Sequence, residues 1–138
     1  MSGSHFLDTN VLLYSISTAS DEARKKQIAV ELLERDGGAL SVQVLQEFYV
    51  QATRTTREHP LPHDLAAGLI DAWMRFAVQD NSVPVMRHAL SIKATHGLSY
   101  WDSAIVAAAC AQGCREIWTE ELAHGRQLEG VLVVNPFR

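Results

Sequence analysis

The chain has 138 residues, the size of one domain, and 47% of them are apolar, which is enough to build a core. Charged residues make up 20% of the chain, which argues against disorder, and no apolar run reaches the roughly 20 residues of a transmembrane helix. The net charge of −4 argues mildly against a general nucleic-acid binder, which is usually basic, but not against a nuclease that recruits its own cations.

The N-terminal segment and the cysteines predict a cytoplasmic protein. The opening stretch MSGSHFLDTNVLLY lacks a basic start, and Asp8 interrupts its apolar run, so it is not typical of a signal peptide. Residues 1–4 are consistent with a cloning scar. The only cysteines, Cys110 and Cys114, have a spacing that favours buried thiols over a disulfide scaffold or a zinc site. We therefore expect one domain over residues 1–138, with no membrane segment.

The first half of the chain alternates short apolar runs with helical patterns. Ser20 or Asp21 can cap the first long helix and Gly37-Gly38 can end it, while Ser41 caps the next one. The segment HPLPH then breaks the chain. In chain order we expect a strand at 5–9, a helix within 20–38, a strand at 39–41 and helices at 42–54 and 64–76.

The second half repeats this alternation. Pro84 starts a helix that Gly97 stops, and Ser99 opens the clearest helix of the chain, SYWDSAIVAAACAQG. We expect a strand at 76–80, helices at 84–96 and 99–113, and strands within 115–122 and 130–136. Short apolar strands alternating with helices predict an α/β sandwich built on a mainly parallel sheet of four to five strands.

Acidic residues follow two of the expected strands. Asp8 comes at the end of the first strand, where it either caps a following helix or provides a carboxylate for chemistry; Asp8 alone does not decide between them. Glu120 and Glu121 follow the fourth strand, where Thr119 and the acids behind it would also suit a simple helical cap.

Two further acids lie on expected helices beside apolar residues. Glu47 borders an apolar face, although it would serve equally well as an edge residue in contact with solvent. Asp102 forms an S-x-x-D capping pair with Ser99, yet Trp101 and Ile105 predict that this first turn is partly buried. A buried, unpaired carboxylate is costly and needs a cation or several hydrogen-bond donors.

The four acidic positions share one expected location. In a parallel α/β sheet, the ends of strands and the starts of the helices that follow them lie on the same edge, where ligands bind. Carboxylates gathered there would repel one another unless hard cations bound them, and oxygen-only ligands select Mg²⁺ or Mn²⁺ over zinc. Such a site suits hydrolysis of phosphodiester bonds.

These segments resemble the signatures of a known family. FLDTNVLLY, VLQEF, LSYWDSAIVAAA and IWTEEL are similar, in order and spacing, to those of the PIN-domain nucleases, and most of all to the VapC-type toxins of bacterial toxin–antitoxin pairs. The resemblance covers essentially the whole chain. It implies a three-layer α/β/α sandwich, Mg²⁺- or Mn²⁺-dependent endoribonuclease activity, a homodimer and inhibition by a cognate antitoxin.

The resemblance also implies roles for particular residues. Its first three acids match Asp8, Glu47 and Asp102, and its fourth acid, usually an aspartate two residues after a serine or threonine, is here Glu121, with Glu120 beside it. All four are expected to bind metal: Asp8 and Asp102 hold the main ion, Glu47 acts through water, and Glu121 completes a weaker position. The expected supporting residues are Thr9 and Asn10, which hold the first carboxylate, and Thr119, which contacts a phosphate or a carboxylate.

Basic residues and histidines complete the list of candidates. If RNA binds, the first phosphate contacts are expected from the group RKK (24–26) and from Arg54 and Arg57. A histidine metal site is not expected, because no two histidines pair at i,i+4 on a clear helix. His88 and His96 are expected at the surface, and His124 falls near the fourth acid.

The leading hypothesis is therefore a metal-dependent endoribonuclease that acts on RNA as the toxin of a type II toxin–antitoxin system. The alternatives are a catalytically weak PIN-like module for protein interaction and a Mg²⁺-dependent phosphatase, which usually carries Asp-x-Asp where this chain has Asp8 and Asn10. We also expect a homodimer, because Tyr49, Trp73 and Phe76 give the middle helices more aromatic surface than a small sandwich easily hides.

Overall fold

The computed structural model describes residues 4–138, so residues 1–3 of the expected cloning scar lie outside the described residues. One sheet of six strands, in the order β3-β2-β1-β4-β6-β5, forms the centre of the described part of the chain. The strands are β1 (His5–Leu7), β2 (Gly38–Ser41), β3 (Ala77–Gln79), β4 (Glu116–Trp118), β5 (Gln127–Leu128) and β6 (Val131–Val134).

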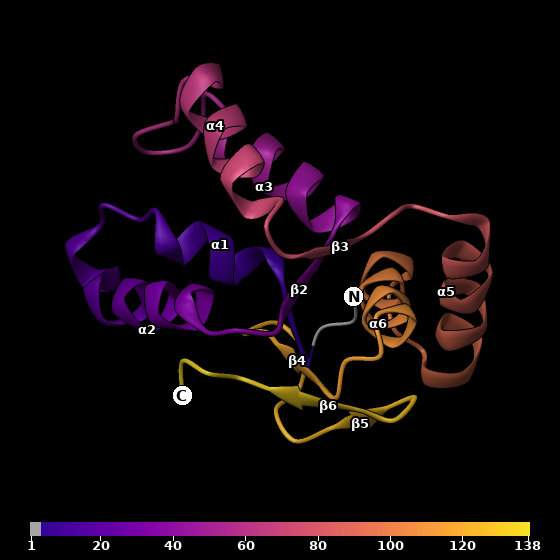
Figure 1. Ribbon diagram of the computed structural model, residues 1–138. Helices are drawn as coiled ribbons and strands as arrows, with labels where there is room; N and C mark the ends of the chain where they lie inside the picture. The colour runs from indigo at the N-terminus through magenta and orange to yellow at the C-terminus, as the bar shows by residue number, and fades with distance from the viewer. Residues whose placement is uncertain (1–3) are drawn as a thin grey trace.

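Helices cover the sheet from both sides (Figure 1). The pair α1 and α2 lies on one side, and α6 lies on the other side with α5 outside it, while α3 and α4 pack against each other beyond α1. The fold is therefore the expected α/β/α sandwich. The helices are α1 (Thr9–Ser15), α2 (Ala23–Glu34), α3 (Val42–Thr53), α4 (His63–Trp73), α5 (Val83–His96) and α6 (Tyr100–Ala111), with a 3-10 turn, η1 (Ser20–Glu22), before α2.

The pairing of strands brings distant residues together at one edge of the sheet. Strand β1 is parallel to both β2 and β4, and Leu7 pairs with Trp118, so the residues that follow these two strands lie side by side. The Asp8 backbone N–H continues the ladder and donates to the Trp118 carbonyl at 3.1 Å. This register places Asp8 next to Thr119, 111 residues later in the chain.

The core fills the space between the sheet and the helices. Phe6, Leu40 and Ile117 on the three central strands are fully buried, and α6 is buried along most of its length because its small residues let it lie between the sheet and α5. Two of the expected caps are confirmed: Ser41 accepts from Val44 N–H and Ser99 from Asp102 N–H. The expected cap from Ser20 or Asp21 is wrong, because both residues lie in the 3-10 turn η1 and α2 begins after Glu22 without a side-chain cap.

Several element boundaries differ from the expectation. The first strand ends at Leu7, because Asp8 caps the short helix α1, and Gly38 belongs to β2 instead of ending a helix. Helix α4 ends at Trp73, where a turn closes with a hydrogen bond from Phe76 N–H to the Trp73 carbonyl. The sixth strand, β5, is an addition: it has two residues, pairs antiparallel with β6 and has too short a pattern to be read from sequence.

The aromatic residues expected at the surface are largely hidden. Trp73 is buried and packs edge-to-face on Phe48, with 4.7 Å between the ring centroids, while Tyr49 and Phe76 are half-buried. The argument for a dimer from these aromatic rings fails for Trp73, whose ring packs on Phe48 between α4 and α3, while the Phe76 ring lies against Gly38 of β2. Within residues 4–138, no helix combines the length and the apolar character needed to cross a bilayer.

Candidate active site

Asp8 fills the first of the two roles between which the sequence left a choice, because it caps α1. Its carboxylate caps α1 by accepting the Thr9 backbone N–H at Oδ1 (2.7 Å), and its Oδ2 accepts the Thr119 hydroxyl (2.8 Å). Burial raises the pKa of Asp8 to about 7; the two hydrogen bonds oppose this shift, and the charges of Glu121 and Glu47 add to it. The cap is thus a buried carboxylate that faces other carboxylates.

Glu47 lies in the middle of α3 and faces the start of α1. The Thr9 hydroxyl donates to its Oε1 at 2.9 Å, so Thr9 contacts Asp8 through its backbone and Glu47 through its side chain. Glu47 is half-buried, which fits neither a fully solvated edge residue nor a core residue. The hydrogen bond from Thr9 orients this carboxylate toward the end of β1.

Asp102 is half-buried and directly precedes the run of buried residues on α6, which begins at Ser103. Its backbone N–H donates to the Ser99 hydroxyl at 3.1 Å, which confirms the cap. The expectation that Trp101 helps to bury this turn is wrong: Trp101 is 63% exposed, whereas Ile105 is buried. The reason is geometric, because helical side chains lean toward the N-terminus and the ring of the second residue projects past the end of the helix.

Glu120 and Glu121 have different neighbours. Lys25 and the Tyr14 hydroxyl both donate to the Glu120 carboxylate, one to each oxygen. Burial alone would raise the pKa of Glu120, but the hydrogen bonds from Lys25 and Tyr14 outweigh burial and lower it. The pKa of Glu121 is raised, first by burial and then by the charges of Asp102, Glu47 and Glu120. Within residues 4–138, Glu121 therefore faces the other acids without a cationic partner, whereas Glu120 has one.

Thr119 joins these residues into one network. Its hydroxyl donates to Asp8 and accepts from the Asn10 side-chain amide (3.2 Å) and the Glu121 backbone N–H (3.0 Å), which uses all its hydrogen-bonding capacity. Asn10 in turn accepts the Glu120 backbone N–H at 3.2 Å. Thr119 is fully buried, so of the two expected contacts it makes the one to a carboxylate and cannot reach a phosphate.

The basic candidates separate into two groups. Arg54 is exposed and lines a groove that also contains Glu47, whereas Arg57 lines a different hollow beside residues 16–22. Arg24 and Lys25 have structural partners: Arg24 donates to the carbonyls of Phe137 and Arg138, and Lys25 pairs with Glu120. Only Lys26 of the RKK group remains exposed on α2 without such a contact among residues 4–138.

The expected histidines lie away from these contacts. His124 accepts the Asn135 backbone N–H at 2.9 Å. His88 and His96 on α5 both bind the carboxylate of Glu129, in the turn between β5 and β6.

Sequence reasoning missed Tyr14 and Lys25. Tyr14 is not among the sequence candidates, and Lys25 belongs to the group expected to contact phosphates, whereas the two residues contact Glu120 across 106 and 95 positions of the sequence. No local pattern signals such contacts. The useful indication was indirect: two adjacent glutamates after one strand cannot both remain uncompensated at low cost.

The donor chemistry of this edge fits a hard divalent cation. Asp8, Glu47, Asp102 and Glu121 offer only oxygen atoms, and their mutual repulsion contributes to the raised pKa values of Asp8 and Glu121. As they stand, no three His, Cys, Asp or Glu side chains within residues 4–138 come close enough to hold a metal ion together. The fit therefore rests on ligand type and uncompensated charge.

Comparisons with known proteins agree with this fold. A model of the PIN domain family matches residues 5–124. A toxin–antitoxin complex from Klebsiella pneumoniae has a TM-score of 0.71 at 21% identity, covering 96% of this chain and 98% of that chain. A search of curated proteins returned no match.

Two further solved structures have the same fold. VapC20 from Mycobacterium tuberculosis, described as a toxin that cleaves the sarcin–ricin loop, has a TM-score of 0.66 at 16% identity, covering 86% of this chain and 92% of that chain. DNA-bound VapBC from Salmonella typhimurium has a TM-score of 0.65 at 18% identity, covering 95% of this chain and 96% of that chain. At these identities the likeness concerns the fold alone.

Proposed function

Because this chain belongs to the PIN domain family, we propose that it is a divalent-metal-dependent endoribonuclease and the toxin of a type II toxin–antitoxin pair. The observation that carries the proposal is the convergence of Asp8, Glu47 and Glu121 with Asp102 near one edge of the sheet. The pKa values of Asp8 and Glu121 are raised there, first by burial and then by neighbouring carboxylates, whereas the adjacent Glu120 is paired with Lys25.

The proposed roles follow from the contacts of each residue. Asp8 and Asp102 hold the main Mg²⁺ or Mn²⁺, and Glu121 contributes to a weaker position. Glu47, oriented by Thr9, holds the attacking water or a metal-bound water. Bound metal would lower the pKa of that water and shield the charge on the phosphate. Asn10 and Thr119 keep the Asp8 carboxylate in place, and Arg54 contacts a substrate phosphate from the neighbouring groove.

A cognate antitoxin and a second copy of the chain are the proposed partners. The shared fold with the toxin–antitoxin complexes from Klebsiella and Salmonella supports a protein inhibitor. Such an inhibitor would bring an arginine or lysine toward Asp8 and Asp102, because a fixed cation neutralises crowded carboxylates and displaces metal. The proposal places the protein in the cytoplasm, where it would meet its RNA substrate.

One observation favours the alternative of a catalytically weak interaction module. Among the described residues, no three acidic side chains are close enough to bind one metal ion together. A bound ion would therefore have to draw the carboxylates closer to one another. The phosphatase alternative requires membership of a different family of α/β proteins. It loses its basis because the chain matches the PIN domain family over residues 5–124.

The test of the proposal is cleavage of RNA by the purified chain. We expect cleavage of single-stranded or hairpin RNA with Mg²⁺ or Mn²⁺ and none in EDTA. Asp102→Asn should lower cleavage by at least about 100-fold, because even groups that only orient metal ligands cost roughly 10- to 100-fold when removed. In EDTA its melting temperature should equal or exceed that of the wild type, since Asn relieves repulsion, and saturating Mg²⁺ should shrink this gain by stabilising only the wild type.

Two substitutions serve as controls. Asp71→Asn, on the exposed surface of α4, should change neither cleavage nor the response to metal. Glu120→Gln should retain more activity than Glu121→Gln, because Glu120 is already paired with Lys25. Cleavage that persists in excess chelator would refute the metal mechanism, and specific binding of a protein partner without any cleavage would favour the interaction module.

A further inference from the structure

Trp101 is the most exposed large apolar side chain among residues 4–138, at 63%. The other two tryptophans, Trp73 and Trp118, are 5% and 7% exposed. Trp101 directly precedes Asp102, one of the proposed metal ligands. An indole left in water beside an acidic site costs apolar burial without contributing to the core, so its position calls for a ligand that covers it.

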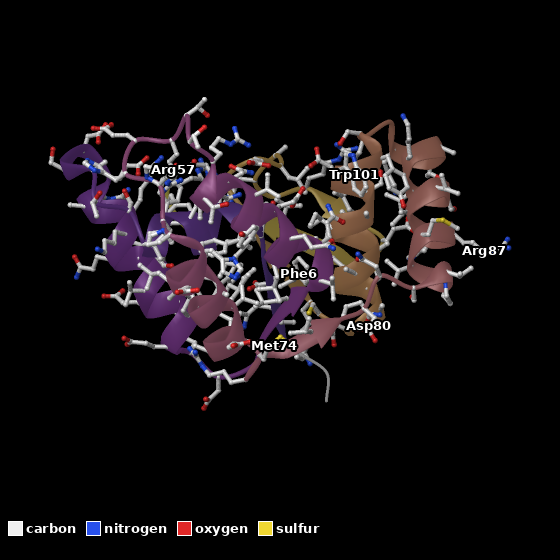
Figure 2. The ribbon with its side chains drawn as sticks, turned by 90° about the horizontal axis from the view of Figure 1, so that it is seen from above. Phe6, Arg57, Met74, Asp80, Arg87 and Trp101 are labelled. Carbon is white, nitrogen blue, oxygen red and sulfur yellow. The ribbon has the colours of Figure 1, made fainter. Side chains whose placement is uncertain are left out.

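The indole lines a groove that also contains Glu47, one of the candidate acids. This groove, of about 350 Å³, lies between α3 and the start of α6 and includes Glu47, Val50, Arg54 and Trp101. A second hollow of about 360 Å³ lies on the other side of Trp101, toward α5, and shares Gln43 and Gln46 with the first. Figure 2 shows Trp101 at the start of α6, with Arg57 on the same side of the view and Met74 on the opposite side.

A hydrogen bond holds the backbone of Trp101, while its indole ring is exposed to solvent. The Gln43 side-chain amide donates to the Trp101 carbonyl at 3.2 Å and so ties the start of α6 to α3. Within residues 4–138 the aromatic neighbour of the ring is Tyr100, at 5.0 Å between centroids and an interplanar angle of 78°. This contact is edge-to-face, so no aromatic ring of the described chain stacks in parallel on the indole.

We propose that Trp101 is a stacking platform for one unpaired base of the RNA substrate, next to the phosphate that is cleaved. This inference rests on the proposed nuclease function and names the part of the substrate that the groove receives. Aromatic rings bind unpaired bases by stacking, whatever the base, because every base has a π-face.

The lining of the groove matches a nucleotide better than an apolar protein segment. Gln46 and Gln51, both exposed, provide amide groups that can donate to and accept from base edges, and Arg54 provides a cation for the attached phosphate. Val50, 58% exposed, completes an apolar wall near the ring. A base on Trp101 would place its own phosphate toward Arg54 and the neighbouring phosphate toward Asp102 and Glu47.

The experiment separates stacking from general apolar contact. In the Asp102→Asn background, which prevents cleavage of the probe, binding of labelled oligoadenylate and oligouridylate is measured by anisotropy for Trp101, Trp101→Phe and Trp101→Leu. Stacking is worth about 1–3 kcal/mol per base, so the Leu variant should bind roughly 5- to 150-fold more weakly, while Phe retains most of the affinity. Leu65→Ala, an exposed residue of α4 outside the groove, is the matched surface control.

Two more readouts complete the test. RNA should quench tryptophan fluorescence in the Asp102→Asn protein but not after Trp101→Phe, because the remaining tryptophans are buried. In the catalytically active chain, Trp101→Leu should raise KM more than it lowers kcat, since stacking binds substrate and does not touch the reacting atoms.

The possible failures are distinguishable. If the wild type cleaves RNA and Trp101→Leu leaves affinity, quenching and KM unchanged, the stacking proposal is wrong and the nuclease function stands. If the wild type neither binds nor cleaves RNA, both proposals fail. A Trp101→Leu variant that changes self-association but not RNA affinity would identify the groove as a protein interface and overturn the proposal.

Discussion

At the scale of single residues, Asp8 shows how one carboxylate satisfies a structural need and still retains capacity for chemistry. Each of its oxygens accepts one hydrogen bond from the protein, one from Thr9 and one from Thr119. A carboxylate has about four acceptor positions, so roughly half of its capacity remains for a cation. The cap thus orients the carboxylate without saturating it.

The raised pKa of Asp8 predicts an unusual pH dependence in the absence of metal. The folded protein binds this proton more tightly than the unfolded chain, whose value is near 3.8, so protonation favours folding. The stabilising contribution is complete below the unfolded pKa and is lost as pH rises through the folded value of about 7. In EDTA, the urea concentration at the midpoint of unfolding should therefore decrease as the pH is raised from about 5 to about 8.

Asp8→Asn supplies the control for this prediction. The variant cannot ionise at this position, so its unfolding midpoint should change much less over the same pH interval. Saturating Mg²⁺ at the upper pH should restore stability to the wild type alone, because the ion binds the folded state. Equal pH profiles for the two proteins in EDTA would show that Asp8 ionises in the folded chain at no cost.

At the scale of elements, α5 is tied to the β5–β6 hairpin through its histidines. His88 and His96 are eight residues apart, which brings them to nearly the same face of the helix, and they bind the two oxygens of Glu129 at 3.2 and 2.9 Å. Glu129 lies in the turn at φ +53°, a left-handed conformation that non-glycine residues rarely adopt. Its hydrogen bonds to His96 and His88 lower its pKa.

Glu129→Gln should weaken this connection. A lowered carboxyl pKa contributes stability that is present above the unfolded value of 4.5 and is lost as pH falls through the folded value, so the effect should appear near neutral pH. We expect a small fall in melting temperature and faster amide exchange in the β5–β6 hairpin than in β1 or β4. Glu58→Gln, beside His59 in an exposed loop, is the matched control and should have neither effect. Unchanged exchange in the hairpin would contradict the structural role.

At the scale of the whole molecule, α5 carries an exposed apolar stripe. Because α6 occupies the layer against the sheet, α5 packs on α6 and presents Val83, Met86 and Leu90 to solvent, at 58%, 43% and 53% exposure. Their spacing of three and four residues places them on one face of the helix. This apolar stripe replaces the aromatic rings as the reason to expect a homodimer.

Leu90→Glu should therefore dissociate the dimer. A charge placed in an apolar interface is left without a partner and is costly to bury. Light scattering at micromolar concentration should give about twice 15.3 kDa for the wild type and 15.3 kDa for the variant. Val30→Glu, an exposed substitution on α2, controls for the added charge and should remain dimeric. A wild type that is monomeric throughout this range would rule the interface out.

The sequence by itself determined the features that depend on neighbours along the chain. Strand ends, capping serines and helical spacing are local, so the single α/β domain, most element positions and the chain segments that carry Asp8, Glu47, Asp102 and Glu121 could be predicted. The family segments could be recognised for the same reason, since they are short runs of consecutive residues. The errors within these predictions were at boundaries, where a cap or turn shortens an element.

Only the tertiary structure decided which side chains meet. Lys25 reaches Glu120 across 95 positions of the sequence, and this contact is what distinguishes Glu120 from Glu121. Whether Trp73 is buried or Trp101 exposed likewise depended on which helix packs beside each ring, and no local pattern records that. Strand pairing and helix packing bring distant residues within a few ångströms, and the resulting burial and charge determine the pKa of Asp8 and the neighbours that each acid has.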